Sequence, residues 1–259
     1  MTTTPNRPST APAGRPPVVD PATWEAAREA LLVREKAHTR EGDAIAAARR
    51  RLPAVEVDAS VEVVGPDGPV PFSTRFQGRD ELVLYQHMWW DGAPHQGQCE
   101  GCTWAAWHLH DAAYLHARGV SFAAVTTGAW EEVAPYVEFM GYRQPWCSVR
   151  GLAAPVGGEM GFLSVFLRDG DRVLLTYRTT GRGNEVVNPS MALLDMTPRG
   201  RGEAWEDVPE GWPQGRDACW WWRTDAAGNP TGGPTSRPVP QWTRPGATPV
   251  HTLGRTGHH

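Results

Sequence analysis

The first apolar pattern along the chain is helical. Residues 24–52 scatter apolar side chains among Ala, Glu and Arg with few helix breakers, which is typical of one or two surface helices. Asp20 followed by Pro21 is a favourable helix start, Pro53 ends the segment, and Gly42 is a candidate break. Charged residues dominate elsewhere, so we expect this extension to pack across the surface of another part of the protein.

The pattern then changes to short apolar runs that predict strands of a buried sheet. These runs cover residues 61–64, 70–72, 82–85, 120–126, 145–149, 163–168 and 173–177. Helices are expected between them, over residues 103–118 and 131–140, each closed by a glycine. Gly65 to Gly68 and Asp169-Gly170 mark two hairpin turns. Strands that alternate with helices and then pair as a hairpin predict an α/β fold with a central mixed sheet.

This pattern divides the chain into four parts. The two ends are dense in Pro, Gly and Thr and have few side chains to bury, which predicts disorder. The expected organisation is a disordered tail over 1–19, a helical extension over 20–53, one α/β domain over 54–223 and a disordered tail over 224–259.

Composition excludes several classes of function. The 259 residues carry a net charge of −4, so the strong positive charge of nucleic-acid binders is missing and no nucleic-acid partner is expected. No apolar run approaches the roughly 20 residues that a membrane helix needs, so no membrane partner is expected either. The first residues do not resemble a signal peptide, which favours a cytoplasmic location. Phosphate-binding glycine loops and the nucleophile elbow of hydrolases are also missing from the sequence.

Chemistry is concentrated in the cysteines Cys99, Cys102, Cys147 and Cys219. Four cysteines in a chain of this length are no disulfide framework, and in a cytoplasmic protein a Cys-x-x-Cys pair is more often reactive or metal-binding than structural. The pair lies where a helix is expected to begin, and helix N-termini stabilise thiolates. We therefore expect Cys99 to be the nucleophile and Cys102, one turn later, to be the resolving thiol. The alternative is that both are small buried residues without chemistry.

Several dispersed blocks of the chain carry a family resemblance. They include Trp24-x-x-Ala27-Arg28-x-x-Leu31-Leu32, Phe76-x-Gly78-Arg79, the Cys99-x-x-Cys102 block with Trp104, the hairpin SVFLRDGDRV, Leu193 to Pro198, and Trp220 to Arg223. Over residues 24–223 the sequence resembles a bacterial thioredoxin-like family of unknown function, whose members are often labelled predicted dithiol-disulfide oxidoreductases. The resemblance implies a thioredoxin or peroxiredoxin-like fold with an N-terminal helical extension. The activity of that family is not defined, so the thiol-disulfide oxidoreductase hypothesis rests on the cysteine pair itself.

One departure from thioredoxins affects the expected substrate. Thioredoxins place a cis-proline at the start of the strand that faces the cysteine pair, but no proline occurs here between Pro155 and Pro189. Counting back from Gly170 places Phe162 or one of its neighbours at that position, and an aromatic ring there would cover the Cys99 sulfur. Such a site favours a small-molecule or thiol substrate over a folded protein. The alternative is that Pro155 takes the role through a displaced loop.

Two further sets of residues complete the candidate site. Trp89, Trp90 and Trp104 surround the cysteine pair in sequence and, with Phe162, are candidates for the walls of a substrate-binding site. Each of these aromatic residues could equally be part of the apolar core. In the leading hypothesis the protein needs no cofactor. The alternative hypothesis is a copper or zinc site built from His87, His95, Cys99 and Cys102. A third is an inert thioredoxin-like module that binds partners through its helical extension.

Overall fold

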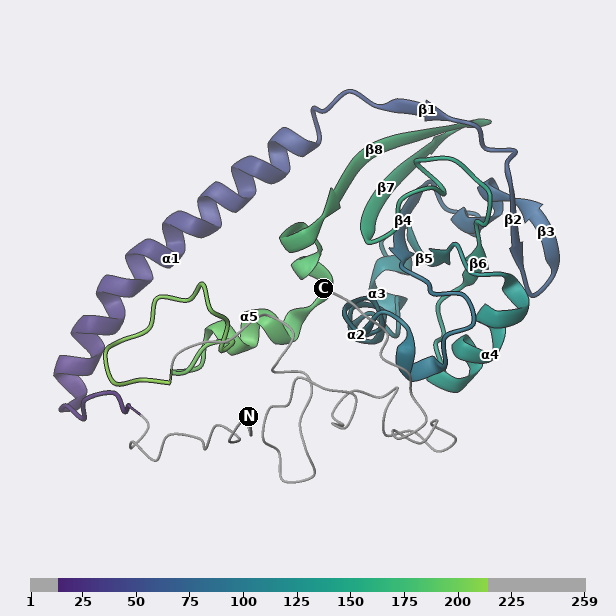
Figure 1. Ribbon diagram of the computed structural model, residues 1–259. Helices are drawn as coiled ribbons and strands as arrows, with labels where there is room; N and C mark the ends of the chain where they lie inside the picture. Colours follow the sequence, from purple (N-terminus) through teal and green to yellow (C-terminus); the bar gives the residue numbers. More distant parts are fainter. Residues whose placement is uncertain (1–13, 214–259) are drawn as a thin grey trace, which may run out of the picture.

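The computed structural model describes residues 14–213, and the structural statements below concern this part of the chain. Its centre is an eight-stranded sheet in the order β1-β8-β7-β4-β5-β6-β2-β3 (Figure 1). The strands are β1 (Val55–Val57), β2 (Glu62–Gly65), β3 (Gly68–Pro71), β4 (Glu81–His87), β5 (Val120–Thr126), β6 (Trp146–Ser148), β7 (Phe162–Asp169) and β8 (Arg172–Thr180). Strands β4, β5 and β6 are parallel neighbours and the remaining pairs are antiparallel, so the sheet is mixed.

Helices connect the parallel strands. The α-helices are α1 (Pro21–Arg49), α2 (Glu100–His108), α3 (Ala113–His116), α4 (Trp130–Met140) and α5 (Pro189–Asp195), and the 3-10 helices are η1 (Phe72–Phe76), η2 (His95–Gly97) and η3 (Gly181–Val187). Helices α2 and α3 lie between β4 and β5 in the chain, and the β7–β8 hairpin pairs antiparallel to β4. This arrangement is the predicted α/β fold with a central mixed sheet.

The two faces of the sheet enter separate apolar clusters. Because successive side chains of a strand point to opposite faces, positions 82, 84 and 86 of β4 face one way and positions 83, 85 and 87 face the other. The first face packs on η1, through Leu82, Leu84, Phe72, Phe76 and Phe166. The second face packs on α2 and α4, through Tyr85, Cys102, Ala105, Ala106, Ala124, Val133, Tyr136 and Trp146. The cysteine pair therefore belongs to the second face.

The predicted turns and most helix ends are confirmed. Gly65 pairs with Gly68 across the first hairpin, and Gly170 takes a positive φ of 62° in the second. Helix α4 ends at Gly141, whose φ of 67° lets its amide donate to the carbonyls of Val137 and Glu138.

The helix expected over residues 103–118 is instead two shorter helices. Helix α2 ends at His108, and α3 begins at Ala113 after an interruption. The Asp111 carboxylate accepts a hydrogen bond from the Ala113 amide at 2.8 Å. A side chain that bonds its own backbone in this way competes with the helical pattern, and composition alone did not reveal it.

The N-terminal extension is a single helix. Helix α1 has 29 residues and continues through Gly42, so the candidate break is not used. Its start is as predicted, because the Asp20 carboxylate accepts from the amides of Ala22 and Thr23 at 3.0 and 3.1 Å. None of its residues is buried, contrary to the expectation that it packs across another surface, and it leads away from the sheet (Figure 1).

Within residues 14–213 no helix is both long and apolar enough to cross a membrane. The predicted disorder of residues 1–13 and 224–259 lies outside the described part of the chain, as do Cys219 and the tryptophans that follow it.

Candidate active site: a thiol pair at the start of helix α2

The fold places the cysteine pair at the end of the central strand. Strand β4 ends at His87, a loop follows, and Cys99 is the N-cap residue of α2. The Cys99 carbonyl accepts the Thr103 amide at 2.9 Å, as the first bond of the helix. Both cysteines are free thiols. Cys102 is only 2% exposed, whereas Cys99 is half-buried, so Cys99 is the more accessible residue of the pair.

The loop before the pair is held by one side chain. The amide group of Gln98 accepts from the Trp90 backbone amide at 3.0 Å and donates to the carbonyls of Trp90 and Ala93 at 3.0 and 3.2 Å. Gln98 is 1% exposed and directly precedes Cys99. The loop is therefore a fixed wall beside the first thiol.

The Cys102 sulfur collects hydrogen-bond donors. The Met88 backbone amide donates to it at 3.5 Å, and the thiol of Cys99 and the hydroxyl of Tyr85 also hydrogen-bond to it. Hydrogen bonds to the charged form favour ionisation, so these donors lower the pKa of Cys102 although burial acts in the opposite direction.

Cys99 is shifted the other way. Its hydrogen bond to Cys102, followed by burial, raises its pKa well above the usual value, while the amides of Cys102 and Gly101 at the helix start lower it. The two thiols thus share one proton in the singly ionised state, with the charge on Cys102 and the proton on Cys99. The helix start favours the Cys99 thiolate as expected, but the hydrogen bond between the sulfurs outweighs it.

A buried polar chain ties the start of α2 to the central strand. The Thr103 hydroxyl donates to the Cys99 carbonyl at 2.8 Å, and the Tyr136 hydroxyl of α4 lies 2.7 Å from Thr103. The Tyr142 hydroxyl donates to the Thr103 carbonyl at 3.1 Å. His87 Nε2 lies 3.4 Å from the Tyr136 hydroxyl, so three elements meet at this point.

His87 belongs to this polar chain and is not in contact with solvent. It is fully buried, and its Nδ1 lies 2.6 Å from the Met88 carbonyl, which requires the hydrogen to be on Nδ1 because a carbonyl only accepts. Burial lowers the pKa of His87 from 6.5 to about 4, so the imidazole is neutral at physiological pH. In this structure His87 is a neutral core residue that hydrogen-bonds the Met88 carbonyl and the Tyr136 hydroxyl.

The apolar surroundings of the pair differ from the expected ones. The residues packed with Cys99 and Cys102 on this face include Leu163, Met88, Leu109 and Phe122. Phe162 pairs with Gln86, on the opposite face of the sheet, and its ring lies 3.6 Å from the guanidinium carbon of Arg178. Phe162 itself therefore does not cover Cys99, and its neighbour Leu163 lies on the face of the cysteine pair.

The structure does contain a cis peptide bond, between Ala154 and Pro155. The Pro155 carbonyl accepts from the Gln86 side chain at 3.2 Å, and the adjacent Val156 packs in the cluster of the η1 face. Because Gln86 and Tyr85 project from opposite faces, this proline lies across the sheet from Cys102.

The tryptophans near the pair in sequence have separate environments. Trp89 is 8% exposed, packs edge-on against Tyr136, and its indole N–H donates to Glu132 at 3.4 Å. Trp104 is half-buried, with its ring 5.3 Å from that of His108, and Trp90 is held through its backbone by Gln98. Their role in substrate binding stays a prediction.

The alternative metal site is not assembled. Among residues 14–213 no group of three or more His, Cys, Asp or Glu side chains is placed to hold a metal ion. His87 is committed to Met88 and Tyr136, and the half-buried His95 ring lies 4.7 Å from Phe139. His95 borders a cavity of about 400 Å³ with Trp89, which neither Cys99 nor Cys102 lines.

Sequence reasoning missed the residues that surround the two sulfurs. Thr103 had a local signal, because a threonine four residues after Cys99 can bond back to its carbonyl. Tyr85 and His87 share the parity of one strand face. This alternation does not reveal which face of the sheet the helices cover. The contacts of Tyr85 with Cys102 and of His87 with Tyr136 could therefore be seen only in the structure.

Cys147 is a third, separate thiol. It is 0% exposed on the η1 face of β6, as expected for a buried strand residue. Burial raises its pKa to about 12, partly offset by the nearby Arg75.

Comparisons with known proteins identify a family for this sequence. A family model described as "Bacterial protein of unknown function (DUF899)" matches residues 13–227. No curated protein matches the sequence.

Several solved structures have partial similarity. The peroxidoxin BcpB from Mycobacterium tuberculosis is 20% identical with a TM-score of 0.36, over 53% of this chain and 95% of that one. A putative thiol:disulfide interchange protein DsbE from Chlorobium tepidum is 14% identical with a TM-score of 0.37, over 54% and 98%. A secreted disulfide oxidoreductase from Mycobacterium tuberculosis, homologous to E. coli DsbE, is 12% identical with a TM-score of 0.30, over 53% and 98%. These values are too low to transfer an activity.

Proposed function

The chain belongs to DUF899, a bacterial protein family of unknown function, and from the geometry of its cysteine pair we propose that it is a thiol-disulfide oxidoreductase. The observation that carries the proposal is the asymmetry of the pair. Cys99 is reachable at the start of α2, and the buried Cys102 is surrounded by three donors that favour its thiolate. Only a thiolate attacks a disulfide, and a second thiolate must then resolve the intermediate.

The reaction proceeds in two exchanges. In the first, the Cys99 proton moves to Cys102, and the Cys99 thiolate attacks a substrate disulfide, forming a mixed disulfide and releasing one substrate thiolate. In the second, the Cys102 thiol gives its proton to that leaving group, and the resulting Cys102 thiolate attacks the Cys99 sulfur and releases the second half of the substrate as a thiolate. One substrate disulfide and the singly ionised protein dithiol become one substrate thiol, one substrate thiolate and a Cys99–Cys102 disulfide, so atoms, protons and electrons balance.

We further propose a small disulfide as the substrate. The support is the restricted approach to Cys99, which is half-buried and follows a loop that Gln98 holds in place. The earlier reason, an aromatic ring from Phe162 over the sulfur, does not hold in this structure. The proposal therefore depends on the loop before the pair.

Trapping the mixed disulfide tests both proposals. Cys102→Ser should accumulate a covalent adduct at Cys99 with hydroxyethyl disulfide, detected by mass spectrometry, and Cys99→Ser should accumulate none. Cys147→Ser is the matched control and should cycle like the unchanged protein. Absence of a reversible Cys99–Cys102 disulfide under any redox buffer would refute the proposed activity. Reduction of insulin as fast as of hydroxyethyl disulfide would refute only the substrate class.

A further inference from the structure

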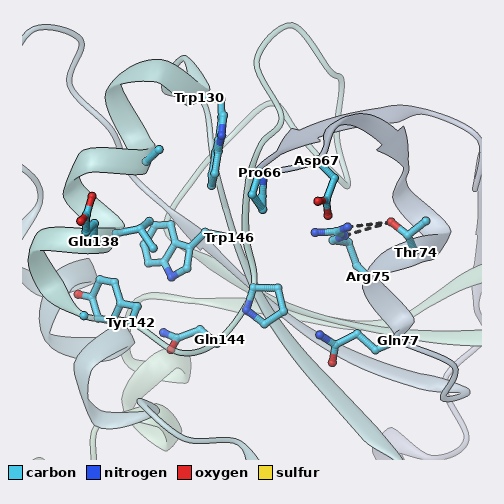
Figure 2. A pocket seen from close by; sticks show the side chains of 14 residues that line it. Pro66, Asp67, Thr74, Arg75, Gln77, Trp130, Glu138, Tyr142, Gln144 and Trp146 are labelled. Carbon is cyan, nitrogen blue, oxygen red and sulfur yellow. Dashed lines mark hydrogen bonds between the residues drawn. The ribbon is translucent and has the colours of Figure 1, made fainter.

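A second cavity lies at the edge of the sheet, away from the cysteine pair. It has a volume of about 660 Å³ and opens between the β2–β3 turn, η1 and α4 (Figure 2). Neither Cys99 nor Cys102 lines it. Small-molecule sites in proteins usually measure about 300–1,000 Å³, so a ligand of ordinary metabolite size fits.

Flat apolar groups form much of its wall. Figure 2 shows the rings of Trp130 and Trp146 on one side of the cavity, with Pro66 between them and Arg75. The Trp146 ring is already fixed, because it stacks on Tyr142 at 5.1 Å and 18°. Rigid aromatic walls of this kind favour a flat, aromatic ligand.

Two buried polar atoms at this wall have no partner. Gln144 is 6% exposed; its amide nitrogen donates to the Ala106 carbonyl at 3.3 Å, but its Oε1 has no hydrogen bond. Trp146 is 2% exposed, and its indole N–H has none either. Buried polar groups are normally paired, and the last torsion of a glutamine is soft enough to turn the oxygen. Because Gln144 and Trp146 both line the cavity, an occupant that brings one donor and one acceptor to this wall could pair them.

The charged side chains that line the cavity further limit the kind of ligand that could bind there. Of the five N–H groups of an arginine, Arg75 directs two at the Thr74 hydroxyl, at 3.2 and 2.9 Å, and it also hydrogen-bonds the Cys147 thiol. The remaining donors are available to a ligand. Two carboxylates, Asp67 and Glu138, also line the cavity, and Figure 2 shows Asp67 on the side of Arg75.

These features exclude simple ligands. A plain anion would meet two carboxylates for one guanidinium, and a hydrocarbon would leave the free donor and acceptor unpaired. We propose that this cavity binds a planar heterocycle with hydrogen-bond donors and acceptors along its edge, of the nucleobase or isoalloxazine kind. The ring would pack on Trp130 and its edge would meet Arg75 and Gln144. The proposal does not depend on disulfide exchange by Cys99.

Calorimetric titration of the full-length protein tests this site with riboflavin and adenosine as probes and benzoate as a comparison. We expect at least one heterocycle to bind in the micromolar range and benzoate to bind much more weakly. Trp130→Ala and Gln144→Met should each weaken binding by about tenfold or more. Trp205→Ala is the matched control, because Trp205 is 54% exposed and does not line the cavity, and it should leave the affinity unchanged.

The outcomes separate clearly. Failure of both heterocycles to bind at millimolar concentration would overturn the proposal, as would benzoate binding equally tightly. Binding that persists in Trp130→Ala would place the ligand elsewhere and overturn it too. Circular dichroism establishes that each variant is folded. If Gln144→Met disturbs the fold, the affinity of Trp130→Ala alone tests the proposal, because Trp130 is only half-buried.

Discussion

Removing the Tyr85 hydroxyl should make the cysteine pair harder to ionise. Tyr85 is 3% exposed on the central strand, and its hydroxyl is one of three hydrogen-bonding groups at the Cys102 sulfur, with the Cys99 thiol and the Met88 amide. Tyr85→Phe keeps the ring in the apolar cluster and removes only the donor. The change therefore acts on the thiolate more than on the packing.

The size of the effect follows from the donor count. A hydrogen bond to a charged group contributes about 1.5–3 kcal/mol. Two donors remain and can shorten their bonds, so the lower end of this range applies. A loss of about 1.5 kcal/mol corresponds to a rise of about one pKa unit in the first ionisation of the pair.

The measurement is the pH dependence of thiolate absorbance and of Cys99 alkylation, with Tyr177→Phe as the control. Tyr177 lies on β8 with Arg49 over its ring at 4.9 Å and is separate from the pair. The first ionisation should shift upward in Tyr85→Phe and stay in place in Tyr177→Phe. An unchanged titration curve in Tyr85→Phe would show that its hydroxyl does not support the Cys102 thiolate.

Three further expectations follow from buried groups. The pKa of His87 is about 4 in the folded protein against the usual 6.5, so between these two pH values the unfolded chain binds a proton that the folded chain does not. The free energy of unfolding should therefore fall by about 3 kcal/mol as the pH drops through this window. In urea titrations, the free energy of unfolding of His87→Gln should depend less on pH. Cys147, with a pKa of about 12 and no exposed surface, should resist iodoacetamide at neutral pH in the folded protein and react only after denaturation. The Arg201 side chain is 4% exposed and hydrogen-bonds Asp195 at 2.6 Å and Glu185 at 3.0 Å. Because both carboxylates keep access to water, at 44% and 24% exposed, Arg201→Ala should lower the free energy of unfolding by about 1.5 kcal/mol, and a thermal melt matching the unchanged protein would contradict this.

Much of the fold could be predicted because its signals are local. The runs at 82–85 and 120–126 are apolar without interruption, and each became a central parallel strand. Hairpin glycines and the glycine after α4 have the positive φ values that other residues avoid. Strand β1 has three residues and pairs only with β8, so its own sequence carries too little signal.

The environment of the thiols could not be predicted in the same way. Which side chain lies over a cysteine depends on strand register, and a shift of one residue exchanges the two faces of a sheet. This is why Leu163, and not Phe162, accompanies Cys102. The break at Asp111 has a similar origin, since one side-chain bond to Ala113 overrides a helical pattern.

The two cysteines are held in different ways, and this difference suits the two exchanges of the proposed reaction. The Cys102 sulfur is bound to the central strand and its extension through Tyr85 and Met88, whereas Cys99 is fixed through its carbonyl by Thr103. Because Cys99 is also the more exposed of the two residues, it is the one that meets the substrate, whereas the pair at rest holds its negative charge on Cys102. Once Cys102 has given up its proton after the first exchange, its thiolate lies beside the mixed disulfide at a high effective concentration. Resolution by Cys102 should accordingly outpace release by an external thiol, which is the property that separates a two-cysteine exchanger from a single reactive cysteine.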